Sequence, residues 1–98
     1  MILVIGSVVA KPGEIDRALS LSREHVLRSR AEPGCVSHAV HRDTENPDRL
    51  VFVEEWADRE SLSRHFQVRE SRAFARALGQ LAAEAPAMSI YEAAKVRV

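Results

Sequence analysis

Trp56 and His65 are side chains that could take part in chemistry, and they lie close together around a predicted strand–helix junction. A tryptophan at the end of a strand can form one wall of a cleft for an aromatic ligand, with its indole N–H free to donate to a ligand oxygen. A histidine, whose ordinary pKa is about 6.5, can act as a base or hydrogen-bond donor toward a phenol-like substrate. Both residue types are also common in purely structural positions, so type alone leaves the two interpretations open.

Further histidines could reach the same region of the fold. His25 borders the apolar stripe of a predicted helix, an edge position facing the space between helix and sheet. His38 and His41 lie at an odd separation on one predicted strand, so they point to opposite faces and cannot bind one metal together. A metal site built from His25, His38 and His65 is conceivable, but the chain has no metal-ligand spacing motif. We therefore expect neither a metal nor another cofactor.

The remaining polar motifs are interpreted as structural. Glu54 and Glu55 are adjacent on a predicted strand and point to opposite faces, so they are not an acid/base pair. Cys35 follows a Pro-Gly turn without a sequence-adjacent histidine, which indicates a packing role. The arginines of the last predicted helix lie opposite its apolar stripe, as expected for a solvated face. The chain has no glycine-rich nucleotide-binding loop and no hydrolase or metalloprotease motif.

Composition restricts the class of protein. The chain has 98 residues, which fits one domain over residues 1–98, and it is 46% hydrophobic and 29% charged, as in globular proteins. A formal net charge of zero predicts neither nucleic acid nor an anionic membrane as a partner. The single cysteine cannot form an intrachain disulfide, and the apolar start of the chain lacks a basic leader. We expect a cytoplasmic protein.

Hydrophobic periodicity predicts the order β-α-β-β-α-β. Asn46-Pro47-Asp48 predicts a hairpin turn, and Asp58 is expected to cap the second helical region. Strands are expected at Met1–Ala10, Cys35–Arg42, Leu50–Trp56 and Met88–Val98. A first helix is expected at Glu14–Arg30. A second helical region is expected from Asp58 to Pro86, with a break around Gln67–Glu70. In that second region Leu62 and Phe66 are expected to point inward. Two helical regions can cover only one face of a four-stranded sheet.

The strands are apolar on both faces. Ile2, Val4 and Val8 point one way on the first strand, while Leu3, Ile5 and Val9 point the other way. An apolar face without helices would be poorly tolerated in water, and a second copy packing sheet to sheet would cover it. The sequence therefore predicts a homodimer.

Several short segments together resemble the antibiotic biosynthesis monooxygenase (ABM) domain family over nearly the whole chain. They are Glu32-Pro-Gly-Cys35, the hairpin ending in Glu54-Glu55-Trp56, the helix start Asp58-Arg-Glu-Ser-Leu62, and His65-Phe66. The resemblance implies an α+β, ferredoxin-like β-α-β-β-α-β fold that pairs through its sheets into a dimeric α+β barrel. It also implies a cleft in each subunit between the sheet and the helices.

The resemblance also implies a chemistry and a set of residues. Relatives in this family oxidise phenols or quinols with molecular oxygen, without metal or flavin. Trp56 matches the family tryptophan, and His65 and His25 match histidines often found with it. Phe52 stands where antibiotic-tailoring members have Asn, Leu62 where they have Tyr, and His38 where many relatives have Tyr. The haem-degrading branch fits poorly, because Gly6 stands at its first-strand Asn position.

Our leading hypothesis is a cofactor-independent monooxygenase acting on a small aromatic phenol or quinol. His65 and His25 are the predicted catalytic residues. Trp56, Phe52, His38 and Phe66 are predicted to line the substrate cleft. One alternative is isomerisation or dehydration of a small metabolite on the same scaffold, by proton transfer. The other is a dimeric ligand-binding protein without catalysis.

Overall fold

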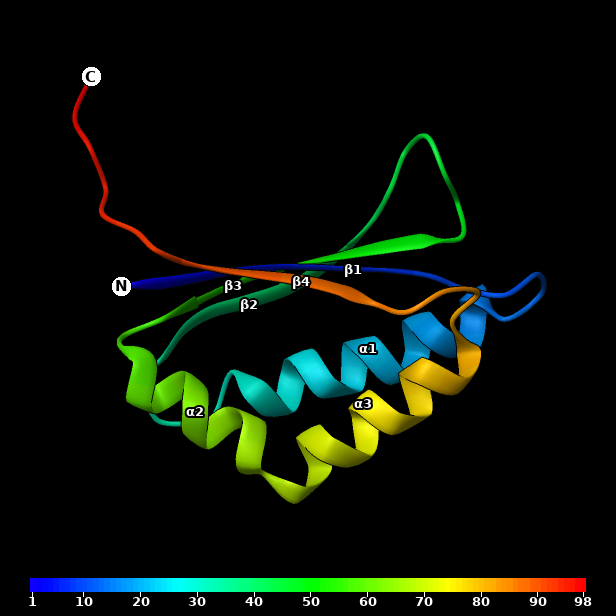
Figure 1. The fold of residues 1–98 in the computed structure, drawn as a ribbon, viewed down its shortest axis with the longest axis horizontal. Coiled ribbons are helices and arrows are strands. Elements are labelled where there is room, and N and C mark those ends of the chain that lie inside the picture. Colours follow the sequence, from blue (N-terminus) through cyan, green and yellow to red (C-terminus); the bar gives the residue numbers. More distant parts are fainter.

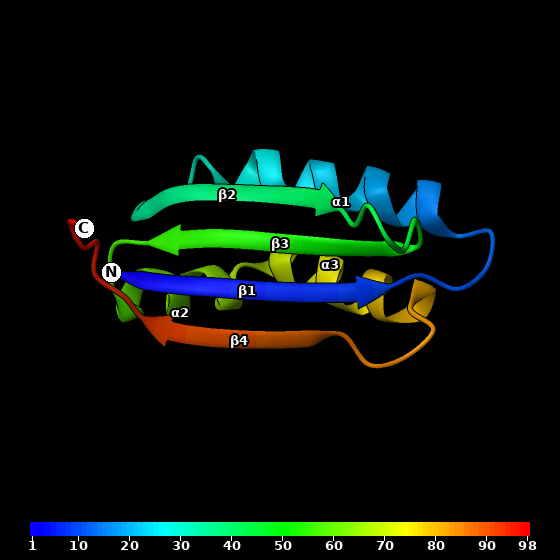
Figure 2. The ribbon, with the colours of Figure 1, turned by 90° about the horizontal axis from the view of Figure 1, so that it is seen from above.

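A computed structural model describes residues 1–98, which form a four-stranded antiparallel sheet with helices on one face (Figure 1). The strands are β1 (Ile2–Val9), β2 (Cys35–Arg42), β3 (Arg49–Trp56) and β4 (Ala87–Glu92), and the helices are α1 (Ile15–Ser29), α2 (Arg59–Gln67) and α3 (Arg69–Leu81). The sheet order is β2-β3-β1-β4, and Figure 2 shows the helices behind it. The predicted α+β ferredoxin-like order is confirmed.

Two boundaries test the sequence prediction in detail. The helical region breaks at Val68, which has extended backbone angles (φ −61°, ψ 130°), and this confirms the break expected around Gln67–Glu70. The predicted last strand, Met88–Val98, is wrong in its second half, because β4 ends at Glu92. Glu92 pairs with Ile2, the first residue of β1, so the partner strand ends there.

Local hydrogen bonds fix where α2 and the hairpin begin. The Asp58 carboxylate accepts from the backbone N–H of Ser61 at 2.8 Å, which confirms Asp58 as the N-cap of α2. In the hairpin turn, the Asn46 side chain accepts from the N–H of Asp48 at 3.0 Å. The resulting β2–β3 register places His38 directly opposite Glu54. The start of α2 and the register of β2 on β3 determine which side chains of these two elements face the interior.

The interior contains two apolar clusters and a group of buried polar side chains that touches both. The larger cluster lies under α1 and α3 and includes Leu50, Phe52 and Leu78. The smaller cluster includes Trp56 and Leu62 near the start of α2. His65 lies 4.6 Å from the Trp56 ring centroid, and His25 stacks on Phe74 at 4.0 Å. The polar group therefore lies between the two parts of the core.

The helices lie on one side of the sheet and leave its other face without them (Figure 1). Apolar side chains on that face are intermediate or exposed, as strands with two apolar faces predict. Ile5 is 36% exposed, and its neighbour across the strands is Val53. Leu3 and Val9 of β1 and Val51 of β3 lie on the same face and are each intermediate in exposure. This face carries the apolar surface on which the prediction of a second copy depends.

Gly34, in the loop before β2, is expected to tolerate no side chain. Its φ of +83° is left-handed, and a Cβ there would collide with the side chain of Ser61 in α2. Gly13 has a nearly equal φ of +82° but no atom within 4 Å of the added Cβ. We expect Gly13→Ala to cost about 1 kcal/mol from backbone strain, and Gly34→Ala roughly 2 kcal/mol more from overpacking. Urea unfolding of both variants measures the difference, and equal costs would contradict the predicted collision.

Candidate functional site

Three histidines from three different elements meet beneath the sheet. They are His25 from α1, His38 from β2 and His65 from α2. Each offers one ring nitrogen, and these nitrogens all lie within 4.8 Å of one another. All three residues are buried, with exposures of 7%, 1% and 3%. The fold thus gathers residues that show no common spacing motif in the sequence.

His65 is held by a carboxylate from the loop after α1. Its Nδ1 lies 2.9 Å from Glu32 Oε1, a distance at which Nδ1–H donates to the carboxylate. The proton on Nδ1 leaves the Nε2 lone pair of this ring free. Because His65 lines the cavity described below, Nε2 is available to a bound molecule as a base.

His25 is held by an arginine, which imposes the opposite tautomer. Arg28 Nη2 lies 2.8 Å from His25 Nδ1, and a guanidinium can only donate, so Nδ1 accepts. The neutral ring therefore carries its proton on Nε2 and acts there as a donor. Arg28 is fixed in turn by Glu32 at 3.0 Å and by Ser71 of α3 at 3.2 Å. One arginine–carboxylate pair thus sets the tautomers of two histidines.

His38 lies behind the other two rings, beside Glu54 and Trp56. Its Nε2 is 3.2 Å from Glu54 Oε1 but lies off the line of a hydrogen bond, and neither ring nitrogen has a hydrogen-bond partner. The same Glu54 oxygen accepts from the Trp56 indole N–H at 2.9 Å. The expectation of a free indole N–H is therefore wrong. Trp56 is fully buried and forms part of the core, because its polar atom is satisfied within the protein.

Burial and neighbouring groups shift the pKa of two of these side chains, His25 and Glu54. Burial, followed by the neighbouring charges of His38, His65 and Arg28, lowers the pKa of His25 from 6.5 to about 3. Burial alone would raise the pKa of Glu54, but its contacts with His38 and the Trp56 N–H outweigh that effect and lower it. At neutral pH, His25 is therefore a neutral donor and Glu54 a carboxylate.

A cavity of about 240 Å³ opens beside the histidines, between β1, β3, α3 and the start of β4. Its polar wall contains His25, His65 and Glu54, and its apolar wall includes Phe52 and Phe74. Four of the predicted site residues line it: His25, His65, Phe52 and Phe66. Trp56 and His38 do not, because both are buried behind its polar wall.

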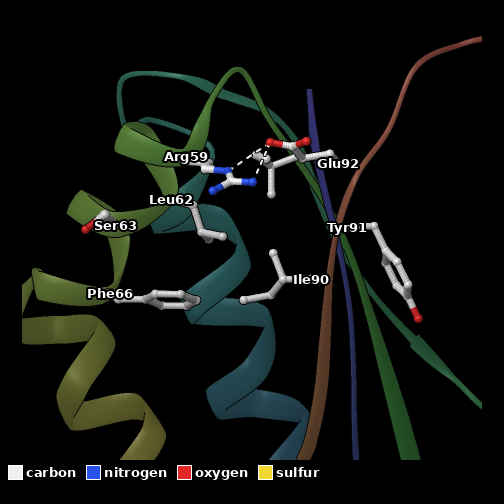
Figure 3. Close-up of a pocket in the computed structure, with 8 residues that line it drawn as sticks. Arg59, Leu62, Ser63, Phe66, Ile90, Tyr91 and Glu92 are labelled. Carbon is white, nitrogen blue, oxygen red and sulfur yellow. Dashed lines mark hydrogen bonds and ion pairs between the residues drawn. The ribbon is translucent and has the colours of Figure 1, made fainter.

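A second hollow of about 310 Å³ lies on the other side of Phe66, near the end of β4 (Figure 3). Phe66 lines both hollows and is 40% exposed, so its predicted inward orientation is wrong. His65 takes the buried position beside Leu62 instead. At the rim Arg59 pairs with Glu92 at 2.6 Å. This second hollow contains no histidine, so the candidate site is the first cavity.

Sequence reasoning missed Glu32, Arg28 and Glu54 as members of the site. Glu54 could have been found, because strand alternation places it on the same face as Phe52 and Trp56. Arg28 lies three residues after His25 in the same helix, a spacing that brings side chains together. Glu32 is in an irregular loop, and no local pattern indicates that it reaches His65.

Acid is expected to destabilise the fold through His25. The unfolded histidine has the higher pKa, so the unfolded state binds more protons between pH 6.5 and about 3, and stability falls as pH falls through that window. The expected loss from this residue is about 2 kcal/mol between pH 7 and pH 5. Urea unfolding at both pH values measures it. His25→Gln keeps an acceptor for Arg28 and should reduce the dependence of the free energy of unfolding on pH. The exposed control His41→Gln should not reduce it. If His25→Gln and the wild type lose the same stability between the two pH values, His25 is not the source of the acid sensitivity.

The fold and the cavity define a class: a ferredoxin-like α+β domain with a buried histidine group beside a mainly apolar cavity. The family model described as antibiotic biosynthesis monooxygenase matches residues 1–77. The chain belongs to the ABM family, which confirms the resemblance seen in its sequence. In addition, none of the helices has the length and apolar character that crossing a membrane requires.

The chain is also similar to individual proteins and solved structures. The chain is 30% identical over 96 residues to the uncharacterized protein sll1783 of Synechocystis sp., covering 98% of this chain and 65% of that protein. The chain therefore spans less than two thirds of the length of that curated relative. A crystal structure of an antibiotic biosynthesis monooxygenase is 29% identical, with a TM-score of 0.90 and coverage of 97% of this chain and 100% of that chain. A conserved protein from Methanosarcina mazei Go1 is 26% identical, with a TM-score of 0.88 and coverage of 92% and 89%.

Proposed function

We propose that the protein is a cofactor-independent monooxygenase that oxidises a small phenol or quinol with O₂. The observation that carries the proposal is the pairing of a base, His65 Nε2, with a donor, His25 Nε2–H. Their ring centroids are 5.2 Å apart, and both rings line one mainly apolar cavity. Family membership supports the same class of reaction.

The first step of the proposed reaction is removal of the phenolic proton. His65 Nε2 takes the proton, and Glu32 on Nδ1 stabilises the imidazolium that forms. The His25 Nε2–H donates to the phenolate oxygen, and Arg28 keeps that proton in place. A fixed donor in a site of low dielectric stabilises an oxyanion more strongly than water does.

The second step uses the electron-rich phenolate as the reductant of O₂. One electron passes to O₂, and the resulting radical pair combines to form a carbon–oxygen bond at a ring carbon that carries hydrogen and lies ortho or para to the phenolate. The peroxide anion takes back the proton held by the His65 imidazolium, and the hydroperoxide then loses the proton of that ring carbon together with hydroxide as water, which leaves a quinone. One oxygen atom of O₂ enters the product and the other leaves in water. Phe52 and Phe74 would keep the intermediates away from bulk water.

The volume of the cavity supports a small substrate. About 240 Å³ is below the range of roughly 300–1,000 Å³ that is usual for drug-sized ligands. Aromatic side chains cover its apolar wall, and polar groups converge at one end. A phenol or quinol of one or two rings would place its hydroxyl at the histidines and its apolar edge against Phe52.

Oxygen uptake with a panel of hydroquinones and naphthols tests the proposal. We expect oxygen consumption with quinone formation in equal amounts, unchanged by a chelator. Turnover that proceeds equally without oxygen would replace the proposal with proton-transfer chemistry such as isomerisation, for which the same base and donor are suited. Thermal shifts with these compounds but no product would instead support a ligand-binding protein.

We also propose that two copies pair through the sheet face without helices. Its apolar residues, among them Ile5 and Val53, form the surface that a second copy would cover. Sedimentation at micromolar concentration should give a dimer, and Ile5→Asp should give a folded monomer. A monomeric wild type would exclude the pairing.

A further inference from the structure

We propose that His25, His38 and His65 form a binding site for a borderline divalent transition metal such as Zn²⁺ or Co²⁺, for which Arg28 is a competitor. The proposal uses the same histidines as the oxygenase but does not depend on that activity. Neutral imidazole nitrogens are the ligands these ions prefer, and three of them with an open fourth position form a common reactive metal centre.

The geometry of the three rings supports this inference. Their ligand nitrogens lie within 4.8 Å of one another, whereas bonds of about 2.0–2.1 Å to tetrahedral zinc require nitrogens about 3.4 Å apart. Side-chain movements of roughly 1 Å would close that gap. The fourth position would face the cavity, since His25 and His65 line it.

His38 provides a second, independent observation. Its ring is 1% exposed, and neither of its nitrogens has a hydrogen-bond partner. A buried polar group without a partner is costly, so such a side chain needs an explanation. Its nearest polar atom is Glu54 Oε1, 3.2 Å from Nε2 but off the line of a hydrogen bond, and the rings of His25 and His65 lie at centroid distances of 5.3 and 5.7 Å. A metal bound to one ring nitrogen of His38 would satisfy it.

Two carboxylates lie beside the proposed ligand histidines, where hydrogen-bonding partners of metal ligands are usually found. Glu32 accepts from Nδ1 of His65, which orients Nε2 as a ligand atom. Glu54 lies 3.2 Å from Nε2 of His38, close enough to orient that ring through a small rotation. Carboxylate–histidine pairs of this kind usually fix the tautomer and raise the basicity of a ligating imidazole.

Arg28 is the group that opposes the metal. It donates to Nδ1 of His25 and so places a proton on Nε2, the nitrogen that a metal would need. Metal binding therefore requires His25 to change tautomer and Arg28 to move toward Glu32 and Ser71, its other partners. Arg28→Gln offers a side-chain oxygen that can accept from Nδ1–H, which favours the ligating tautomer.

Calorimetry with Zn²⁺ and absorption spectroscopy with Co²⁺, on the full chain without any substrate, test the site. We expect one ion per chain and an intense visible Co²⁺ spectrum typical of a tetrahedral site. Affinity should fall at least tenfold in His38→Asn and His65→Asn, and should rise at least tenfold in Arg28→Gln. His41 is the fourth histidine and is exposed. His41→Asn is therefore the matched control and should bind the metal as the wild type does.

The two proposals fail separately. Absence of Zn²⁺ and Co²⁺ binding at millimolar concentration, in both the wild type and Arg28→Gln, overturns the metal site and leaves the oxygenase proposal intact. The metal site is also overturned if His41→Asn weakens metal binding as much as His38→Asn does. If Arg28→Gln binds the metal with wild-type affinity, Arg28 does not compete with the metal for His25. Circular dichroism confirms that each variant is folded, and the expected gain in Arg28→Gln does not depend on damage to the core.

Discussion

Replacing His65 by Asn is expected to lower phenol oxidation by at least about 100-fold, the usual contribution of a positioned general base. Asn is close in size to the imidazole and can keep a hydrogen bond to Glu32, but it cannot accept the phenolic proton. The loss should appear mainly in kcat, since the apolar wall of the cavity, including Phe52, remains. Steady-state oxygen uptake measures the effect.

Glu32→Gln and His41→Asn complete this test. Glu32 contacts the base without lining the cavity, so Glu32→Gln should give an intermediate loss of about tenfold. His41 is exposed, and its replacement should leave turnover unchanged. If His65→Asn keeps more than a tenth of wild-type turnover while its fold is intact, His65 is not the base.

Trp56→Ala should lower the free energy of unfolding by about 3–5 kcal/mol, the range for deleting a large buried aromatic side chain. Trp56 is fully buried at the junction of β3 and α2, and it packs with Val4 and Leu62. The deletion also leaves Glu54 without its indole donor. Chemical denaturation measures the loss, and a cost below about 1 kcal/mol would mean that the indole is not part of the core.

A pair of milder variants separates the packing role of the indole from its hydrogen bond. Trp56→Phe keeps most of the bulk but leaves the buried Glu54 carboxylate with one fewer donor, at a cost of about 1–3 kcal/mol. Glu54→Gln in the Trp56→Phe background removes the charge and should recover part of that loss. Additive effects of the two changes in a double-mutant cycle would show that the contact contributes little.

The fold could be predicted from the sequence because its signals are local and repeated. Nearly continuous apolar runs on β1 and β3 specify strands with two apolar faces, and Asp58 marks the start of α2. The end of β4 could not be predicted in the same way. Ala93–Val98 still contains apolar residues, but β4 ends at Glu92, opposite Ile2, and beyond it only Ala93 still exchanges hydrogen bonds with Met1.

The candidate site was only partly predictable, because its members belong to distant parts of the chain. His25 and His65 could be recognised from their helical positions and the family resemblance. The expectation of a free indole N–H on Trp56 is wrong, because Glu54 was compared only with Glu55 and was not considered as the acceptor for the indole. The Glu32 contact joins residues 33 positions apart through an irregular loop, and residue type and spacing do not encode such a pairing.

The position of β4 has a consequence for access to the cavity. All six of its residues are exposed, and β1 is its only strand partner, so it is the edge of the sheet that can separate at the lowest cost. Ala87 and Met88 at its start form part of the cavity wall. Fraying from this end would widen the route to His25 and His65 while the buried strands stay paired. The rate at which small molecules exchange with the interior would then be set by the local stability of this edge.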